Sequence, residues 1–183
     1  MNWQQLRTME SRLFSCGHCG NAVASSQGFH TSSSNSFGVY ICPHCSKPSW
    51  ITNTEQVPGP TPGSEVDHLP DEVESLYREA RNCVSVGSYT SAVLACRKLL
   101  MNIAVSQGAE ENKSFYHYVE YLATNGYVPP NGRGWVDHIR LKGNEATHEI
   151  AIMSQQDADD LILFSEMLLK FIYEFPNRIP PAA

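Results

Sequence analysis

The sequence contains no stretch that approaches the roughly 18 consecutive apolar residues of a membrane-spanning helix. Its first residues, Met1–Gln5, do not combine a basic start with an apolar run, so they lack the pattern of a secretory signal peptide. A glycine-rich nucleotide-binding loop and a nucleophile motif are also missing. These absences predict a cytoplasmic protein without membrane contact, and they leave several enzyme classes without support.

A surplus of positive charge is missing as well. The chain has 13 Lys and Arg residues against 19 Asp and Glu residues, a formal net charge of −6, which disfavours non-specific binding to nucleic acid. Residues 1–57 hold three basic and two acidic residues, a net +1, which leaves −7 for the rest of the chain. Any nucleic-acid contact is therefore expected in the N-terminal part.

Four of the six cysteines form two Cys-x-x-Cys pairs, Cys16 with Cys19 and Cys42 with Cys45. In a reducing compartment such cysteines are better explained by metal binding than by disulfides. Zinc takes four thiolates in a tetrahedron at about 2.3 Å, and each pair supplies two of them from one tight turn. Iron and a redox dithiol are the alternatives. The spacing predicts a zinc ribbon over residues 1–52.

The expected Zn²⁺ is structural, because four thiolates leave no coordination position for water. The ribbon has few apolar residues, so metal binding would supply folding free energy on the order of 10 kcal/mol. His18 and His44 are expected to be exposed, with a phosphate contact as the alternative. Gly17 and Gly20 would give the first turn its backbone freedom. Short strands are expected near Val23, Phe29, 37–41 and 50–51, with a mobile loop over 31–36.

Proline and glycine dominate residues 57–64, which cannot continue a helix or a central strand. We therefore expect a linker over residues 53–69 and a helical domain over residues 70–183. In that domain apolar residues recur at helical spacing, and Ser88, Ser114 and a Ser154/Asp157 capping box provide helix starts. Helices are expected over 70–86, 88–107, 114–125, a segment after Pro130 that carries 139–149, and 154–175.

The predicted fold class is mainly α, a bundle of four or five helices preceded by a small β zinc ribbon. The final helix has an unusually wide apolar surface, so it is either central in the bundle or shared between two subunits. We expect a homodimer, with a monomer as the alternative.

A polar cluster lies in the segment 139–149. On a helix, Arg140, Asn144 and His148 fall within about 80° of one another, so they share a face and form a candidate catalytic or binding site. A structural alternative is that His148 closes the end of the helix.

The same alternative assigns structural ion pairs to the arginines. Arg140 would pair with Glu145 or with an acid on the helix over 70–86. Arg97 stands among apolar residues and would need a buried partner such as Glu145, because an unpaired buried charge costs several kcal/mol.

The order of these motifs resembles bacterial proteins with the domain of unknown function 4145 (DUF4145). The resemblance covers nearly the whole chain. It rests on the ribbon, the linker and these segments: Leu69-Pro70-Asp71-Glu72-Val73, Ala95-Cys96-Arg97-Lys98-Leu99-Leu100, Ile139-Arg140, Gly143-Asn144-Glu145-Ala146 with His148-Glu149, and the terminal Leu168-Leu169-Lys170-Phe171-Ile172-Tyr173-Glu174-Phe175-Pro176. That domain is grouped by resemblance with the HEPN superfamily, which are dimeric helical bundles of toxins, anti-phage systems and RNA-processing nucleases.

The resemblance implies a metal-independent ribonuclease cleft at a dimer interface. His148 would be the general base on a ribose 2′-hydroxyl, Arg140 would neutralise the scissile phosphate, and Asn144 would orient either group. The chain departs from the active pattern, because seven residues separate Arg140 from His148 and Gly143 replaces the arginine expected before Asn144. Lys142 has better spacing but cannot make the planar two-point contact of a guanidinium.

Two functions follow from these observations. The favoured one is a zinc-binding, non-catalytic interaction module of a bacterial defence or stress pathway, with a protein, RNA or DNA partner. The alternative is a HEPN-like endoribonuclease or toxin that uses Arg140 and His148.

Overall fold

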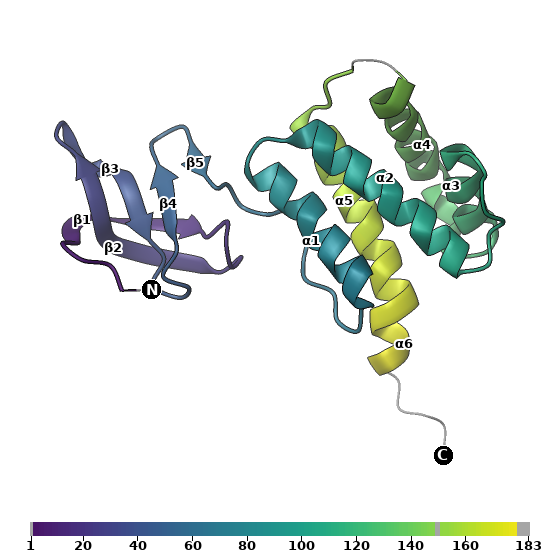
Figure 1. Ribbon diagram of the computed structural model, residues 1–183, viewed down its shortest axis with the longest axis horizontal. Helices are drawn as coiled ribbons and strands as arrows, with labels where there is room; N and C mark the ends of the chain where they lie inside the picture. The colour runs from purple at the N-terminus through teal and green to yellow at the C-terminus, as the bar shows by residue number, and fades with distance from the viewer. Residues whose placement is uncertain (1, 149–150, 179–183) are drawn as a thin grey trace. The chain divides into compact units, whose positions relative to one another are not determined.

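The computed structural model describes residues 2–148 and 151–178, and for residues 144–148 it describes the backbone alone. The chain divides into two compact units, Met1–Thr61 and Pro62–Ala183. The first unit is an antiparallel sheet and the second is built from helices (Figure 1).

The sheet unit has five strands in the order in which they follow in the chain. The hairpin between β2 and β3 is tight, since Thr31 pairs directly with Ser34, so the expectation of a mobile loop over 31–36 is wrong. Serine side chains stabilise this hairpin, with Ser34 Oγ 2.7 Å from Ser36 Oγ. The strands are β1 (Arg7–Ser15), β2 (Ala22–Thr31), β3 (Ser34–Ile41), β4 (Pro48–Ile51) and β5 (Gln56–Val57).

Strand β1 was not expected from the sequence, and side chains link it to the opposite edge of the sheet. Arg12 of β1 donates to the carbonyl of Thr52 at 2.6 Å, and Gln56 of β5 donates to the carbonyl of Ser15 at 2.7 Å. The two edges therefore meet, and these bonds satisfy backbone groups that an open edge would leave unpaired.

The sheet unit has a very small core. Its buried apolar cluster consists of six residues, and two of these are cysteines of the Cys-x-x-Cys pairs. Tyr40 is fully buried and its hydroxyl donates to the carbonyl of Glu10 at 3.0 Å. The cluster comprises Met9, Phe14, Cys16, Tyr40, Cys42 and Ile51.

The helical unit is organised around α2, which packs against α1, α3, α4 and α5. Figure 1 shows α2 running across α5 in the middle of this unit. None of the described helices is both long and apolar enough to cross a membrane. The elements are α1 (Asp71–Ser85), α2 (Tyr89–Ser106), α3 (Phe115–Thr124), η1 (Pro130–Gly132), α4 (Arg133–His148), α5 (Gln155–Leu169), the π-helical turn η2 (Lys170–Glu174) and α6 (Phe175–Arg178).

Helix starts follow the sequence at two of the three expected caps. Ser114 accepts a hydrogen bond from the amide of His117, and Ser154 forms a capping box with Asp157. Ser88 precedes α2 as expected, but its side chain makes no capping bond. The start of α2 is therefore stabilised by burial of its apolar residues rather than by a cap.

Residues 62–67, which we call the strap, fold back onto the helical unit although they fall in the expected linker. The buried carboxylate of Glu166 accepts from the amide of Ser64 at 3.0 Å, and that of Glu174 accepts from the amide of Asp67 at 3.3 Å. Burial alone raises the pKa of Glu166, but hydrogen bonds from Lys170 and Ser64 lower it. Hydrogen bonds to two buried carboxylates therefore hold the strap against the helical unit.

Helix α4 lies very close to α3 at Gly143. A Cβ atom placed there would be 2.1 Å from Cε1 of the buried ring of Phe115. The ring has little room to move, since the Arg97 guanidinium stacks over it at 4.4 Å from the centroid. Gly143 is therefore required by packing, and an arginine at this position would not fit.

We predict that Gly143→Ala destabilises the helical unit by about 1–3 kcal/mol, because overpacking outweighs the gain in helix propensity. Gly134 is a matched control on the same helix, since a Cβ there meets nothing within 4 Å. Gly134→Ala should leave stability unchanged or raise it by up to about 1 kcal/mol. Urea unfolding measures both variants, and equal effects would contradict the packing argument.

Candidate functional site

The two Cys-x-x-Cys turns have the same backbone structure. In each, the amide of the first cysteine donates to the carbonyl five residues further on, and its carbonyl accepts from the amide four residues further on. That fourth residue has a left-handed backbone, with φ of 71° at Gly20 and 59° at Ser46. Gly20 thus has the conformational role expected of it, and the repeated turn places two thiols in each half of the site.

The four thiols lie together at the ends of the turns. Cys16 Sγ is 3.7 Å from Cys45 Sγ, and Cys19 Sγ is 3.9 Å from Cys42 Sγ. All four sulfurs lie within 4.8 Å of one another, and all four thiols are free. A tetrahedron with metal–sulfur bonds of about 2.3 Å has edges of about 3.8 Å. The cluster therefore fits one tetrahedral metal ion and is far too wide for disulfides.

The thiols differ in their electrostatic environment. Burial raises the pKa of Cys16 to about 12. Burial also acts to raise the pKa of Cys19, but hydrogen bonds from the backbone and side chain of Asn21 lower it to about 6. Of these two thiols, Cys19 is therefore the more readily deprotonated for binding a cation.

Gly17 has a role different from the one expected. Its Cβ would lie 2.2 Å from the carbonyl oxygen of Gly59 and 2.6 Å from that of Pro58, so any side chain would collide with backbone. The first turn consequently packs directly on the segment that follows β5.

The histidines of the turns are exposed, as expected, and each forms a bond across to the other half of the site. His18 Nε2 is 2.9 Å from the carbonyl oxygen of Pro48, and His44 Nδ1 is 3.3 Å from Asn21 Nδ2. These contacts connect the two turns and give both histidines a structural role.

The second candidate site contains Arg140, which is engaged by acids. Its Nη1 atom is 2.7 Å from Glu120 Oε2 and 3.1 Å from Asp137 Oδ1, and its guanidinium stacks over the ring of Tyr116 at 3.7 Å from the centroid. Only 14% of the side chain is exposed. The hydrogen bond from Arg133 and the charge of Arg140 lower the pKa of Glu120. This partner lies on α3, so the expected partner on the 70–86 helix is wrong.

The cations near Arg140 are also paired. We call Arg140, Lys142 and Arg97, together with their partners, the Arg140 seam. Lys142 Nζ is 3.2 Å from Asp157 Oδ1, which itself caps α5. Arg97 donates to the carbonyl of Gly143 at 2.6 Å, and burial lowers its pKa. The side chains of Asn144, Glu145 and His148 lie outside the described residues, so their expected roles stay predictions.

Sequence reasoning missed Glu120 and Tyr116, the residues of α3 that hold Arg140. They stand four positions apart, and residues at this spacing share a helix face. An aromatic ring and a carboxylate on one helix face can together bind a cation, so this spacing could have indicated such a face. It did not indicate which helix supplies that cation, because such pairing depends on tertiary packing.

A comparison with protein families gives one match, to the family described as domain of unknown function (DUF4145), over residues 78–180. The chain belongs to the DUF4145 family. No curated protein and no solved structure matches the chain. The DUF4145 match begins inside α1 and runs past α6, so it covers most of the helical unit and excludes the four-cysteine cluster. The chemistry of that cluster therefore rests on its own geometry.

We predict that the protein binds one metal ion per chain and that Cys42→Ala loses this ion and unfolds the sheet unit. The reason is that metal binding contributes free energy on the order of 10 kcal/mol to such small folds. Elemental analysis of the purified protein and near-UV circular dichroism measure the two effects. Cys83→Ala is the control, since Cys83 lies outside the cluster and should keep the metal. An unchanged metal content in Cys42→Ala would contradict the assignment.

Proposed function

We propose that the protein is a non-catalytic interaction module of a bacterial defence or stress pathway, in which a zinc ribbon accompanies a DUF4145 domain and binds a protein or nucleic-acid partner. The observation that supports this most strongly is the complete thiol shell. A tetrahedral ion bound by four sulfurs that lie within 4.8 Å of one another has no position left for water or substrate. Such an ion stabilises a fold and performs no hydrolysis.

Zinc is the ion we propose for the cluster. Four soft thiolates in a tetrahedron suit zinc and iron, and zinc brings no redox chemistry to a site whose role is structural. The metal analysis described above identifies the ion, and iron in stoichiometric amount would count against zinc.

For the helical unit we propose a HEPN-like bundle that forms a homodimer. Leu163 of α5, Phe171 of η2 and Phe175 of α6 are 54%, 50% and 40% exposed, and the two phenylalanine rings meet edge to face at 5.3 Å. Exposed apolar groups of this size are commonly covered in a symmetric dimer. Sedimentation equilibrium should give the mass of two chains, and the mass of one chain at micromolar concentration would count against the dimer.

The competing function, a HEPN-like ribonuclease, requires a guanidinium that can meet a phosphate. Arg140 is paired with Glu120 and Asp137 and is largely buried, and Lys142 is paired with Asp157. Releasing either cation would leave carboxylates unpaired beside an incoming anion, which costs free energy. These pairings favour the structural role of the seam.

We predict that the protein does not cleave mixed RNA, and that His148→Ala behaves as the wild type. Incubation with RNA in the presence and absence of a chelator, followed by gel electrophoresis, measures this. His117→Ala on α3 is a matched control, because His117 is an exposed histidine of the same unit. Chelator-insensitive cleavage that is lost in His148→Ala and kept in His117→Ala would establish the ribonuclease instead.

A further inference from the structure

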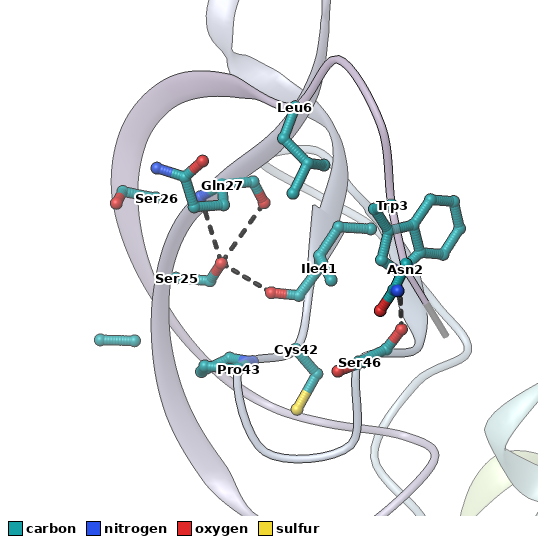
Figure 2. Close-up of a pocket in the computed structure, with 11 residues that line it drawn as sticks. Asn2, Trp3, Leu6, Ser25, Ser26, Gln27, Ile41, Cys42, Pro43 and Ser46 are labelled. Atoms are coloured by element: carbon teal, nitrogen blue, oxygen red, sulfur yellow. Dashed lines mark hydrogen bonds between the residues drawn. The ribbon is translucent and has the colours of Figure 1, made fainter.

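A groove of about 520 Å³ opens on the sheet unit beside the second Cys-x-x-Cys turn (Figure 2). Its walls come from three segments: residues 2–6 before β1, residues 24–27 of β2, and residues 41–46 at the end of β3 and in the turn. This volume falls within the range of about 300–1,000 Å³ that is usual for small-molecule sites. The groove shares Cys42 with the thiol cluster and is separate from the Arg140 seam.

An aromatic ring on the groove wall is held in a fixed position. The indole Nε1 of Trp3 donates to the carbonyl of Ser46 at 2.7 Å, and its ring meets that of Phe29 edge to face at 6.1 Å. A ring fixed in this way loses little conformational entropy when a ligand packs against it. Trp3 therefore provides a pre-organised flat contact.

The polar side chains of the groove are amides and hydroxyls, and some of them can hydrogen-bond a ligand. Ser25 is used internally, since its hydroxyl donates to the carbonyl of Ile41 at 2.7 Å, as Figure 2 shows. The side chains of Asn2, Ser26 and Gln27 have no hydrogen-bond partner within the described part of the chain, and the lining residues include no Asp, Glu, Lys or Arg. Amide and hydroxyl groups beside an aromatic ring suit a flat, neutral ligand with several hydrogen-bonding atoms.

Two cations stand next in sequence to residues that line the groove. Arg7 follows the lining residue Leu6, and Lys47 follows the lining residue Ser46. Both are exposed, and neither has an ion-pair partner among the described residues. The sheet unit has a net charge of +1, while the rest of the chain carries −7. Uncompensated cations beside a neutral groove complement a ligand whose flat ring is joined to anionic groups.

We propose that this groove binds an unpaired nucleobase of a single-stranded nucleic acid, with Arg7 and Lys47 contacting the adjacent phosphates. The proposal rests on the interaction module proposed above and names its ligand class. An aromatic ring with a positively charged backbone track is how proteins bind single strands without strong sequence preference. A base paired in a duplex presents no free face to the groove, so the site selects single strands.

The test uses the full-length, metal-loaded protein and fluorescence anisotropy with a labelled 10-nucleotide oligouridylate and a duplex of equal length. The single strand should bind and the duplex should bind at least 10-fold more weakly. The double variant Ser26→Ala/Gln27→Ala should weaken binding about 5- to 100-fold, since it removes two hydrogen-bonding groups. Arg7→Ala/Lys47→Ala should reduce the slope of log K against log salt by about 1.4, or about 0.7 for each phosphate.

A matched control is Ser32→Ala/Asn35→Ala, which removes the same chemical groups at the far end of the β2–β3 hairpin, outside the groove. It should bind as the wild type does. Equal binding of the duplex, an unchanged affinity in Ser26→Ala/Gln27→Ala, or no oligonucleotide binding would overturn the proposal. Binding of a tryptic casein digest in place of the oligonucleotide would make the groove a peptide site and also overturn it.

The two proposals fail in different ways. A folded protein with one bound zinc ion and no affinity for the oligonucleotide overturns the groove assignment alone. A protein without metal overturns the zinc ribbon, whatever the oligonucleotide measurement gives.

Discussion

The sheet unit depends on four sulfur atoms meeting at one point. Its buried apolar cluster has six residues, and two of them are themselves thiols of that point. Burial of so few side chains cannot offset the conformational entropy of ordering about sixty residues, which costs roughly 1–2 kcal/mol per residue for the backbone alone. A metal ion bound by these thiols would set the relative positions of the two turns, and through them the strand ends, the Gln56 bridge and the groove beside Ser46.

Local sequence patterns predicted much of the fold. Features that depend on contacts between residues far apart in the sequence were not predicted. Helix periodicity and the Ser154/Asp157 box gave the helices, because both depend on residues three or four positions apart. Strand β1 was missed because its buried residues, Met9 and Phe14, are an odd number of positions apart, which breaks the alternation of a strand. An irregularity in the pairing between Thr8 and Arg12 returns both to the core side.

The candidate sites differ in the same respect. The cysteine cluster could be predicted because each Cys-x-x-Cys spacing places two thiols in one short turn. Two such turns are enough to form the site. The surroundings of Arg140 could not be predicted, since Tyr116 and Glu120 reach it from another helix. Gly143 shows the limit most clearly: the sequence marked it as a departure from a nuclease pattern, whereas the ring of Phe115 leaves no space for a larger residue.

The strap gives the helical unit a beginning that differs from the family boundary. The DUF4145 match starts at residue 78, yet Glu166 and Glu174 near the other end of the chain bind the amides of Ser64 and Asp67. A polypeptide trimmed to the matched residues would keep both carboxylates and lose these two backbone donors, so that Lys170 and Arg178 would remain as the partners of Glu166 and Glu174. Recombinant forms of the helical unit should accordingly begin at Pro62, because the folded unit begins before the family match does.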